Sequence, residues 1–463
     1  MKKRLCAALL VCAMLAGCGK KKPVSNVTLM ETTQYEHAIH ALADQGGQKT
    51  VEPEKDKDGF IIVNDTVYVA SNTLNIRVEP SADSNLVKAV AYGTKLQRTG
   101  IGENGWDRVY FENVTAYVSN EYITTLTVQE NRTFEYSTMM LSVVDTSRQI
   151  YSYDSMVEDL AELKERYGEH MKLNSIGSTK DNRSIYEIVI GNPETAKKHI
   201  FFCAGICGAE YMSSLLCMKQ AEYCLCYYDT GVYNGFAYKE LCENACIHVI
   251  PMLNPDSVTI SQEYLACVRD EQIVADLKKW FERDKVKGGK NNSLENYLMF
   301  FYANANGVDL RRNFRYQWDN LGSDIPTEPT SEGYPGAAAE SEPETKALLR
   351  QLTGVTPDLI VTYHTSGAKI TYNFGQAEPK LSIAKRYAEA AAGIMNYEVV
   401  SANAGVSAYG SYEGYCAAER GIPTLEIALG NGNTPLSLNE FNSIWNACRE
   451  SWAVLQLAVI NNK

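Results

Sequence analysis

The sequence predicts an α/β protein with a mostly parallel or mixed sheet, preceded by a small all-β barrel. Strand-like apolar runs alternate with helical segments over residues 150–463, which is typical of an α/β domain. Over residues 61–126, short β-rich runs are separated by glycine-containing turns, as in small barrels. The 463 residues are 45% hydrophobic, which is typical of a folded protein, and the net charge of −12 argues against a nucleic-acid partner.

The N-terminus predicts an exported lipoprotein. Residues 1–17 combine a basic start with an apolar run that is too short to span a bilayer, as in a secretory signal peptide. Leu15-Ala16-Gly17-Cys18 resembles the lipobox of bacterial lipoproteins, which implies cleavage before Cys18 and lipidation of its thiol. We therefore expect a lipid anchor on the outer face of the bacterial cell membrane. The alternative is an ordinary signal peptide with an incidental cysteine.

A tether and a small β domain follow. Residues 18–60 are polar and charged, and we expect them to be a flexible tether. Within residues 61–126, the segment 74–81 (LNIRVEPS) and the later Asn104-Gly105-Trp106 resemble the bacterial SH3-like domain in order and spacing. That resemblance implies either binding to the cell wall or a spacer role for this domain, and both remain open. A polar linker is expected over residues 127–149.

The larger domain, residues 150–463, has the pattern of alternating strands and helices. An amphipathic helix is expected over 155–167, with Met156, Leu160, Leu163 and Tyr167 on one face. Buried-type strands are expected over 185–190, 199–203, 247–250 and 359–363, and helices over 211–226, 381–396 and 438–460. The Pro-, Gly- and Ser-rich segment 322–339 is expected to be a surface loop.

The stretch from Cys203 to Glu210 connects a strand to a helix through small residues. It places Glu210 at the edge of a sheet, where ligands bind in open α/β folds. Cys207 and Glu210 are three residues apart, so both side chains could reach one metal ion. The alternative is a buried thiol beside a carboxylate that stabilises the helix start.

Two later strand ends carry similar side chains, His364 and Glu426, and the segment 307–314 (GVDLRRNF) lies before them. In this order the residues resemble the zinc carboxypeptidase family, whose site uses a His-x-x-Glu pair, a later His and a late Glu. The segments 181–186 and 251–256 match the family as well. The resemblance extends from about residue 151 to the end. It implies a three-layer α/β/α sandwich with a mixed eight-stranded sheet and a zinc site at one sheet edge.

The resemblance also implies roles for individual residues. Zinc needs three protein ligands and one open position, and the matching residues are Cys207, Glu210 and His364. Glu426 takes the position of the general base that activates water. Arg312 matches the arginine that binds the terminal carboxylate of a peptide, and Arg311 beside it is a second candidate for substrate binding.

Three positions depart from the family pattern. Cys207 replaces a histidine, and a thiolate makes zinc a weaker Lewis acid. Arg311 replaces an asparagine, and Tyr302 stands where the family has a cation that stabilises the oxyanion. Tyr409 and Tyr412 are candidates for the family's late tyrosine near the scissile bond.

The predicted function is a zinc-dependent peptidase that cleaves cell-wall (murein) peptides, for example at γ-D-glutamyl–diamino acid bonds. The alternative is a weakened or inactive relative that binds wall peptides. Ten of the 13 cysteines lie between Cys203 and Cys448, and the sequence leaves their disulfide state open. Cys203 and Cys207 match no CxxC motif, which argues against a redox role.

Overall fold

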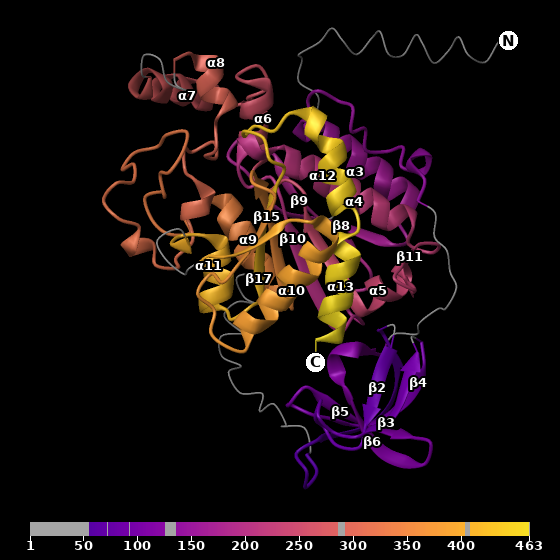
Figure 1. Ribbon diagram of the computed structural model, residues 1–463. Coiled ribbons are helices and arrows are strands. Elements are labelled where there is room, and N and C mark those ends of the chain that lie inside the picture. The colour runs from indigo at the N-terminus through magenta and orange to yellow at the C-terminus, as the bar shows by residue number, and fades with distance from the viewer. Residues whose placement is uncertain are drawn as a thin grey trace, which may run out of the picture. The chain divides into compact units, whose positions relative to one another are not determined.

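The computed structural model describes residues 55–71, 73–91, 93–125, 136–285, 292–402 and 408–462 (Figure 1). The predicted signal peptide, the lipidation site Cys18 and the tether up to residue 54 lie outside the described residues, so those predictions remain predictions. Within the described ranges, no helix is both long and apolar enough to cross a bilayer.

The small domain is a seven-stranded antiparallel sheet with the strand order β3-β2-β6-β5-β4-β1-β7. Its strands are β1 Ile61–Val69, β2 Thr73–Arg77, β3 Leu86–Ala91, β4 Lys95–Ile101, β5 Trp106–Phe111, β6 Val114–Ser119 and β7 Ile123–Thr124. Alternate residues of the strands, such as Val67 and Val69, are fully buried in one core, as the two-residue period requires. Phe60, just before the expected start of this domain, is also buried, with the Arg108 guanidinium 5.1 Å from its ring centroid.

The larger domain is built on a mixed sheet of eight strands, which confirms the prediction. The order is β16-β15-β17-β14-β10-β13-β9-β8. The strands are β8 Met171–Ser178, β9 Ser184–Ile190, β10 Lys198–Cys203, β13 Ala245–Ile250, β14 Leu359–Thr365, β15 Lys369–Tyr372, β16 Glu398–Ser401 and β17 Thr424–Leu429. The central strands β13, β10, β14 and β17 run parallel to their neighbours in this group, so their carboxyl ends share one edge.

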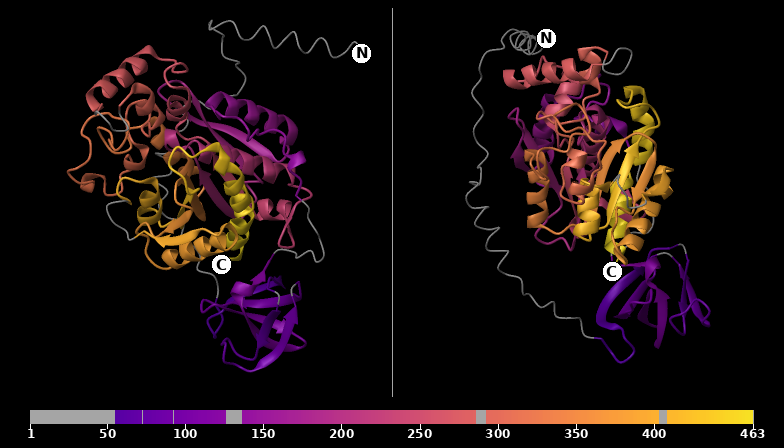
Figure 2. Two further views of the ribbon diagram at one scale, coloured as in Figure 1. Left: turned by 45° about the horizontal axis from the view of Figure 1, so that its top comes forward. Right: turned by 90° about the vertical axis from the view of Figure 1, so that its left-hand side faces the viewer.

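Helices cover both faces of this sheet, which confirms the three-layer α/β/α sandwich (Figures 1 and 2). One face packs against α3 Tyr153–Tyr167, α4 Met212–Cys226, α5 Tyr238–Asn244, α10 Lys380–Met395, α12 Phe441–Cys448 and α13 Ser451–Asn461. The other face packs against α9 Pro343–Gly354 and the short α11 Tyr412–Gly414. A separate apolar cluster joins α6 Pro255–Glu263, α7 Glu271–Asp284 and α8 Leu294–Met299.

Most of the expected elements are present, with one difference near the C-terminus. The helix expected over 438–460 is interrupted at Arg449 and Glu450, which lie between α12 and α13. At this break the Glu450 carboxylate accepts hydrogen bonds from the hydroxyls of Tyr223 and Tyr238, on α4 and α5. The break therefore lies where the chain is fixed to two neighbouring helices.

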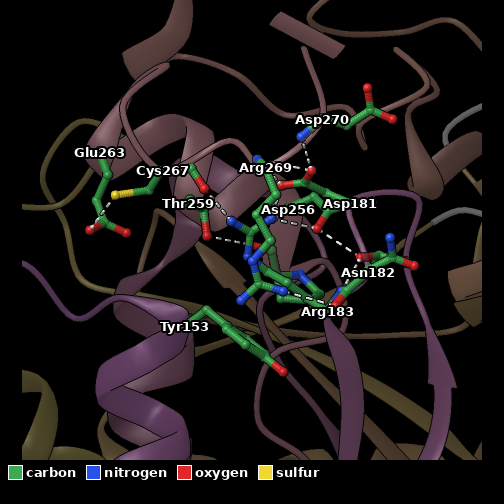
Figure 3. Close-up of polar contacts among 12 residues, drawn as sticks. Tyr153, Asp181, Asn182, Arg183, Asp256, Thr259, Glu263, Cys267, Arg269 and Asp270 are labelled. Atoms are coloured by element: carbon green, nitrogen blue, oxygen red, sulfur yellow. Dashed lines mark hydrogen bonds and ion pairs between the residues drawn. The ribbon is translucent and has the colours of Figure 1, made fainter. Parts of the chain in front are cut away.

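A buried ion-pair network ties the loop before β9 to the start of α6 (Figure 3). The Arg183 guanidinium pairs with Asp181 and lies 2.9 Å from the Asp256 carboxylate. Arg183 also donates to the carbonyl of Cys267 at 2.6 Å, and the guanidinium lies over the ring of Tyr153. All three charged side chains are buried, and the network thus fixes α6 against the sheet at the carboxyl edge of β13. The family-like segment 181–186 has this structural role.

Candidate metal centre and active site

The predicted site residues come from three adjacent parallel strands. Cys207 and Glu210 follow β10, His364 lies near the end of β14, and Glu426 is in β17. β14 pairs with β10 on one side and with β17 on the other, where Thr362 is opposite Glu426. The sheet topology thus brings together residues that are more than 200 positions apart in the sequence.

Cys207 and Glu210 are held by a short 3-10 turn, η3 Gly208–Glu210, which Cys207 begins. The Glu210 amide donates to the carbonyl of Cys207 at 3.1 Å. Gly208 lies directly against α6, since a Cβ there would be 2.2 Å from the hydroxyl of Ser257. Only glycine therefore lets this turn pack on α6. The position of α6 is fixed by the Arg183 ion-pair network described above.

The ligand atoms of Cys207, Glu210 and His364 lie within 4.8 Å of one another, and all three residues are buried. His364 Nδ1 is 2.7 Å from Glu210 Oε2. Burial raises the pKa of the Cys207 thiol to about 12. Burial lowers the pKa of His364, but Glu210 and the hydrogen bonds around the ring outweigh this and raise it well above its ordinary value. A thiol, a carboxylate and an imidazole that converge in this way form a donor set that suits zinc, provided that the thiol and the imidazole lose their protons.

A second carboxylate, Glu413 on α11, contacts the same histidine and was missed by the sequence analysis. Its Oε1 lies 3.5 Å from His364 Nε2 and accepts a hydrogen bond from the Thr362 hydroxyl at 2.5 Å. A carboxylate on the far ring nitrogen is the usual outer partner of a metal-binding histidine. The only sequence signal was a glutamate 13 positions before Glu426, and its contact with His364 depends on the tertiary fold.

Glu426 lies beside this pair, with its carboxylate, that of Glu413 and the His364 ring within 4.8 Å of one another. Burial raises the pKa of Glu426, His364 opposes this, and the nearby carboxylates of Glu413 and Glu210 raise it further. A carboxylate with a raised pKa next to a metal site can accept a proton and return it.

The two candidate substrate-binding arginines differ in their surroundings. The Arg311 guanidinium makes two hydrogen bonds to the buried Asp309, at 3.0 and 2.7 Å, and lies 4.9 Å from the ring centroid of Tyr302. It also pairs with Glu332 at 3.1 Å. Arg312 is half-buried, and its guanidinium has no hydrogen-bond or ion-pair partner among the described residues. Of the two, Arg312 is the one with a guanidinium free to bind a carboxylate.

The two candidate tyrosines are placed differently. Tyr412 is buried and packs against Phe314, with ring centroids 5.2 Å apart. Together with His364, Glu413 and Arg311, it also lines a cavity of about 10 Å³. This volume is about that of one water molecule. Tyr409 is half-buried and lies edge-on to Tyr316. Tyr302 is half-buried, and burial raises its pKa to about 12.

A Cys, Glu and His donor set beside a second carboxylate, at the carboxyl edge of a mixed sheet between helical layers, suits a zinc-dependent hydrolase. Residues 156–453 match the zinc carboxypeptidase family model, and the chain belongs to this family of zinc-dependent peptidases. Residues 72–124 match the model of the bacterial SH3 domain. Both domain types predicted from the sequence are therefore confirmed.

Similar proteins agree with this assignment. The chain is 26% identical over 281 residues to the uncharacterized protein YqgT of Bacillus subtilis (strain 168), covering 59% of this chain and 68% of that protein. It is 25% identical over 299 residues to gamma-D-glutamyl-L-diamino acid endopeptidase 1 of Lysinibacillus sphaericus, covering 64% and 70%. A crystal structure of thrombin activatable fibrinolysis inhibitor has the same fold, with a TM-score of 0.54 at 18% identity, covering 70% of this chain and 77% of that one.

Proposed function

We propose that this protein is a zinc peptidase that hydrolyses amide bonds in cell-wall peptides, such as the bond between a γ-D-glutamyl residue and a diamino acid. The observation that carries the proposal is the convergence of Cys207, Glu210 and His364 beside Glu426. The similarity to an endopeptidase whose name gives this bond, and the SH3 domain, support the choice of a wall peptide. Lipidation of Cys18 would hold the enzyme at the outer face of the cell membrane.

Zinc held by Cys207, Glu210 and His364 would lower the pKa of a water molecule to about 7 and polarise the amide carbonyl. Glu426 accepts the proton of the attacking water and passes it to the leaving amine, for which its raised pKa suits it. Arg312 binds a carboxylate of the peptide through two parallel N–H donors and so fixes the scissile bond. Glu413 holds the His364 ring in place.

A non-catalytic role as a wall-peptide-binding lipoprotein is the second candidate. The observation that favours it is the buried Cys207 thiol, whose pKa burial raises to about 12, so that it is protonated in the metal-free protein. In this alternative, Arg312 still binds a peptide carboxylate, but the site holds no zinc.

Zinc content and hydrolysis together test the proposal. The purified, reduced protein should retain zinc after dialysis, and a His364→Gln variant should contain one equivalent less. Glu426→Gln should keep the zinc but lower kcat on muropeptides by about 100-fold to 10,000-fold, since general-base catalysis has this magnitude. Equal hydrolysis by Glu426→Gln and the parent would remove Glu426 from the mechanism. A His364→Gln variant with the same zinc content as the parent would favour the binding protein.

A further inference from the structure

A second group of metal-binding side chains lies at the opposite edge of the same sheet. His199 is the second residue of β10, and Cys246 and His248 are the second and fourth residues of β13. We call these three residues the strand-start cluster. Because β10 and β13 are parallel and His199 is opposite Cys246, the cluster lies toward the amino ends of the strands, with His248 opposite Phe201. The proposed catalytic site lies at their carboxyl ends, and none of the three residues takes part in it.

The register brings the three ligand atoms together. His199 Nδ1 is 3.2 Å from His248 Nε2, and these two nitrogens and Cys246 Sγ lie within 4.8 Å of one another. Zinc–nitrogen bonds of 2.0–2.1 Å in a tetrahedral site separate two imidazole nitrogens by about 3.3 Å. The nitrogen atoms of His199 and His248 thus already have the spacing of two ligands on one ion.

The surroundings of His248 orient its ring. Glu187 on β9 lies 2.9 Å from His248 Nδ1 and is fixed by amide donors of Gln351 at 2.7 Å and Asn174 at 2.9 Å. A proton on Nδ1, shared with this carboxylate, leaves the lone pair of Nε2 directed at His199. A carboxylate behind a histidine ring is the arrangement that orients metal-binding imidazoles. A simple hydrogen bond between His199 and His248 would not need the Glu187 carboxylate, so its presence favours a metal-binding role for the His248 ring.

The three side chains differ in their exposure to solvent. Cys246 and His248 are buried, whereas His199 is half-buried and opens the cluster to solvent. We propose that His199, Cys246 and His248 bind a second zinc ion, with water as the fourth ligand. On binding, the Cys246 thiol releases its proton to solvent and the His199 proton resides on Nε2. The ion would crosslink β10 and β13 and has a structural role, independent of the proposed peptidase activity.

Metal analysis of single variants tests this second site. The full-length protein and its variants are saturated with zinc under reducing conditions, dialysed and analysed for bound metal. Cys246→Ser and His199→Gln should each lose one equivalent of zinc relative to the parent. Cys267→Ser and His170→Gln, which remove a cysteine and a histidine outside both clusters, should lose none. An unchanged zinc content in both Cys246→Ser and His199→Gln overturns the proposal and leaves a hydrogen-bonded histidine pair.

A spectroscopic readout separates the two sites and does not depend on activity. Each site contains one thiol, so Cys207→Ser leaves Cys246 as the thiolate ligand of the proposed second site. Cobalt(II) bound to Cys207→Ser should still give a thiolate-to-cobalt charge-transfer band, and the double variant with Cys246→Ser should lose it. Absence of the band in Cys207→Ser, with circular dichroism like that of the parent, also overturns the proposal. If the proposed catalytic site bound no metal, this band from Cys246 would still be present, so the two proposals can fail independently.

Discussion

Glu413 provides a direct test of the metal centre, because its carboxylate contacts His364 and is not itself one of the proposed ligands. Burial raises the pKa of Glu413, but the hydrogen bonds from His364 and Thr362 outweigh this, and the pKa is lowered. The side chain is therefore ionised at neutral pH. Both contacts fall on the same oxygen, Oε1. Glu413→Gln keeps an oxygen that can accept from both partners and removes only the charge, whereas Glu413→Leu removes the acceptor as well.

The two variants should weaken zinc binding by different amounts. Loss of an outer partner of a metal-binding histidine lowers metal affinity by about 10-fold to 100-fold. We expect Glu413→Gln to lie near the lower figure, which is about 1.4 kcal/mol, and Glu413→Leu near the upper one, about 2.7 kcal/mol. Competition for zinc against a chromophoric chelator at fixed pH measures both dissociation constants.

The control for charge is Glu398→Gln, on an exposed position of β16, which should bind zinc like the parent. Circular dichroism checks that each variant is folded. Unchanged zinc affinity in both Glu413 variants would refute the reasoning, and so would a greater loss in Glu413→Gln than in Glu413→Leu.

Three further predictions follow from charges in the structure. Arg312→Lys should raise KM at least about tenfold, with kcat unchanged, for peptides with a free carboxylate, because a lysine makes only one of the two charged hydrogen bonds of the arginine. The KM for the corresponding peptide amides should not change. Zinc binding at the proposed catalytic site should displace about two protons at pH 7, from Cys207, whose pKa burial raises to about 12, and from His364, whose pKa is raised. Calorimetry of the Cys246→Ser variant, which lacks the second proposed site, in buffers of different ionisation enthalpy counts them. Burial raises the pKa of Glu344 from 4.5 to about 8, so the folded state binds this proton more tightly than the unfolded state. The free energy of unfolding should therefore fall by up to about 5 kcal/mol as the pH rises from 4.5 through 8. In urea titrations, Glu344→Gln should not show this decrease.

The sequence predicted the architecture well because the strands of the large sheet are strongly marked. β10, β13 and β14 are mostly apolar and largely buried, and such runs indicate the core of an α/β sheet. The edge strands were harder to predict. The exposed ends of β16 carry no apolar pattern, and the break between α12 and α13 is associated with the hydrogen bonds of Glu450 to other helices. Neither feature is encoded in a local repeat.

The candidate site could be predicted only in part. Cys207 and Glu210 follow β10, His364 lies near the end of β14 and Glu426 lies within β17, and the family resemblance named these four as candidates. The contact of Asp309 with Arg311 could not be predicted, because it depends on the direction of the two side chains. The contact of Glu413 with His364 could not be predicted either, because it joins segments distant in the chain. The strand-start cluster was missed for the same reason. His199 and His248 are 49 positions apart and meet only through the register of β10 and β13.

The two unusual residues of the site, Cys207 and Arg311, are related by charge. A thiolate ligand adds a negative charge where the family has a neutral histidine, and Arg311 adds a positive charge where it has a neutral asparagine. The structure brings these two residues within electrostatic range, because Arg311 acts to lower the pKa of Cys207 against the effect of burial. Asp309 fixes the guanidinium in this position. With Cys207 ionised, the pair has the same net charge as the histidine and asparagine that it replaces. Positive charge near a buried thiol favours its ionised form, so the paired departures fit a zinc site with an altered ligand.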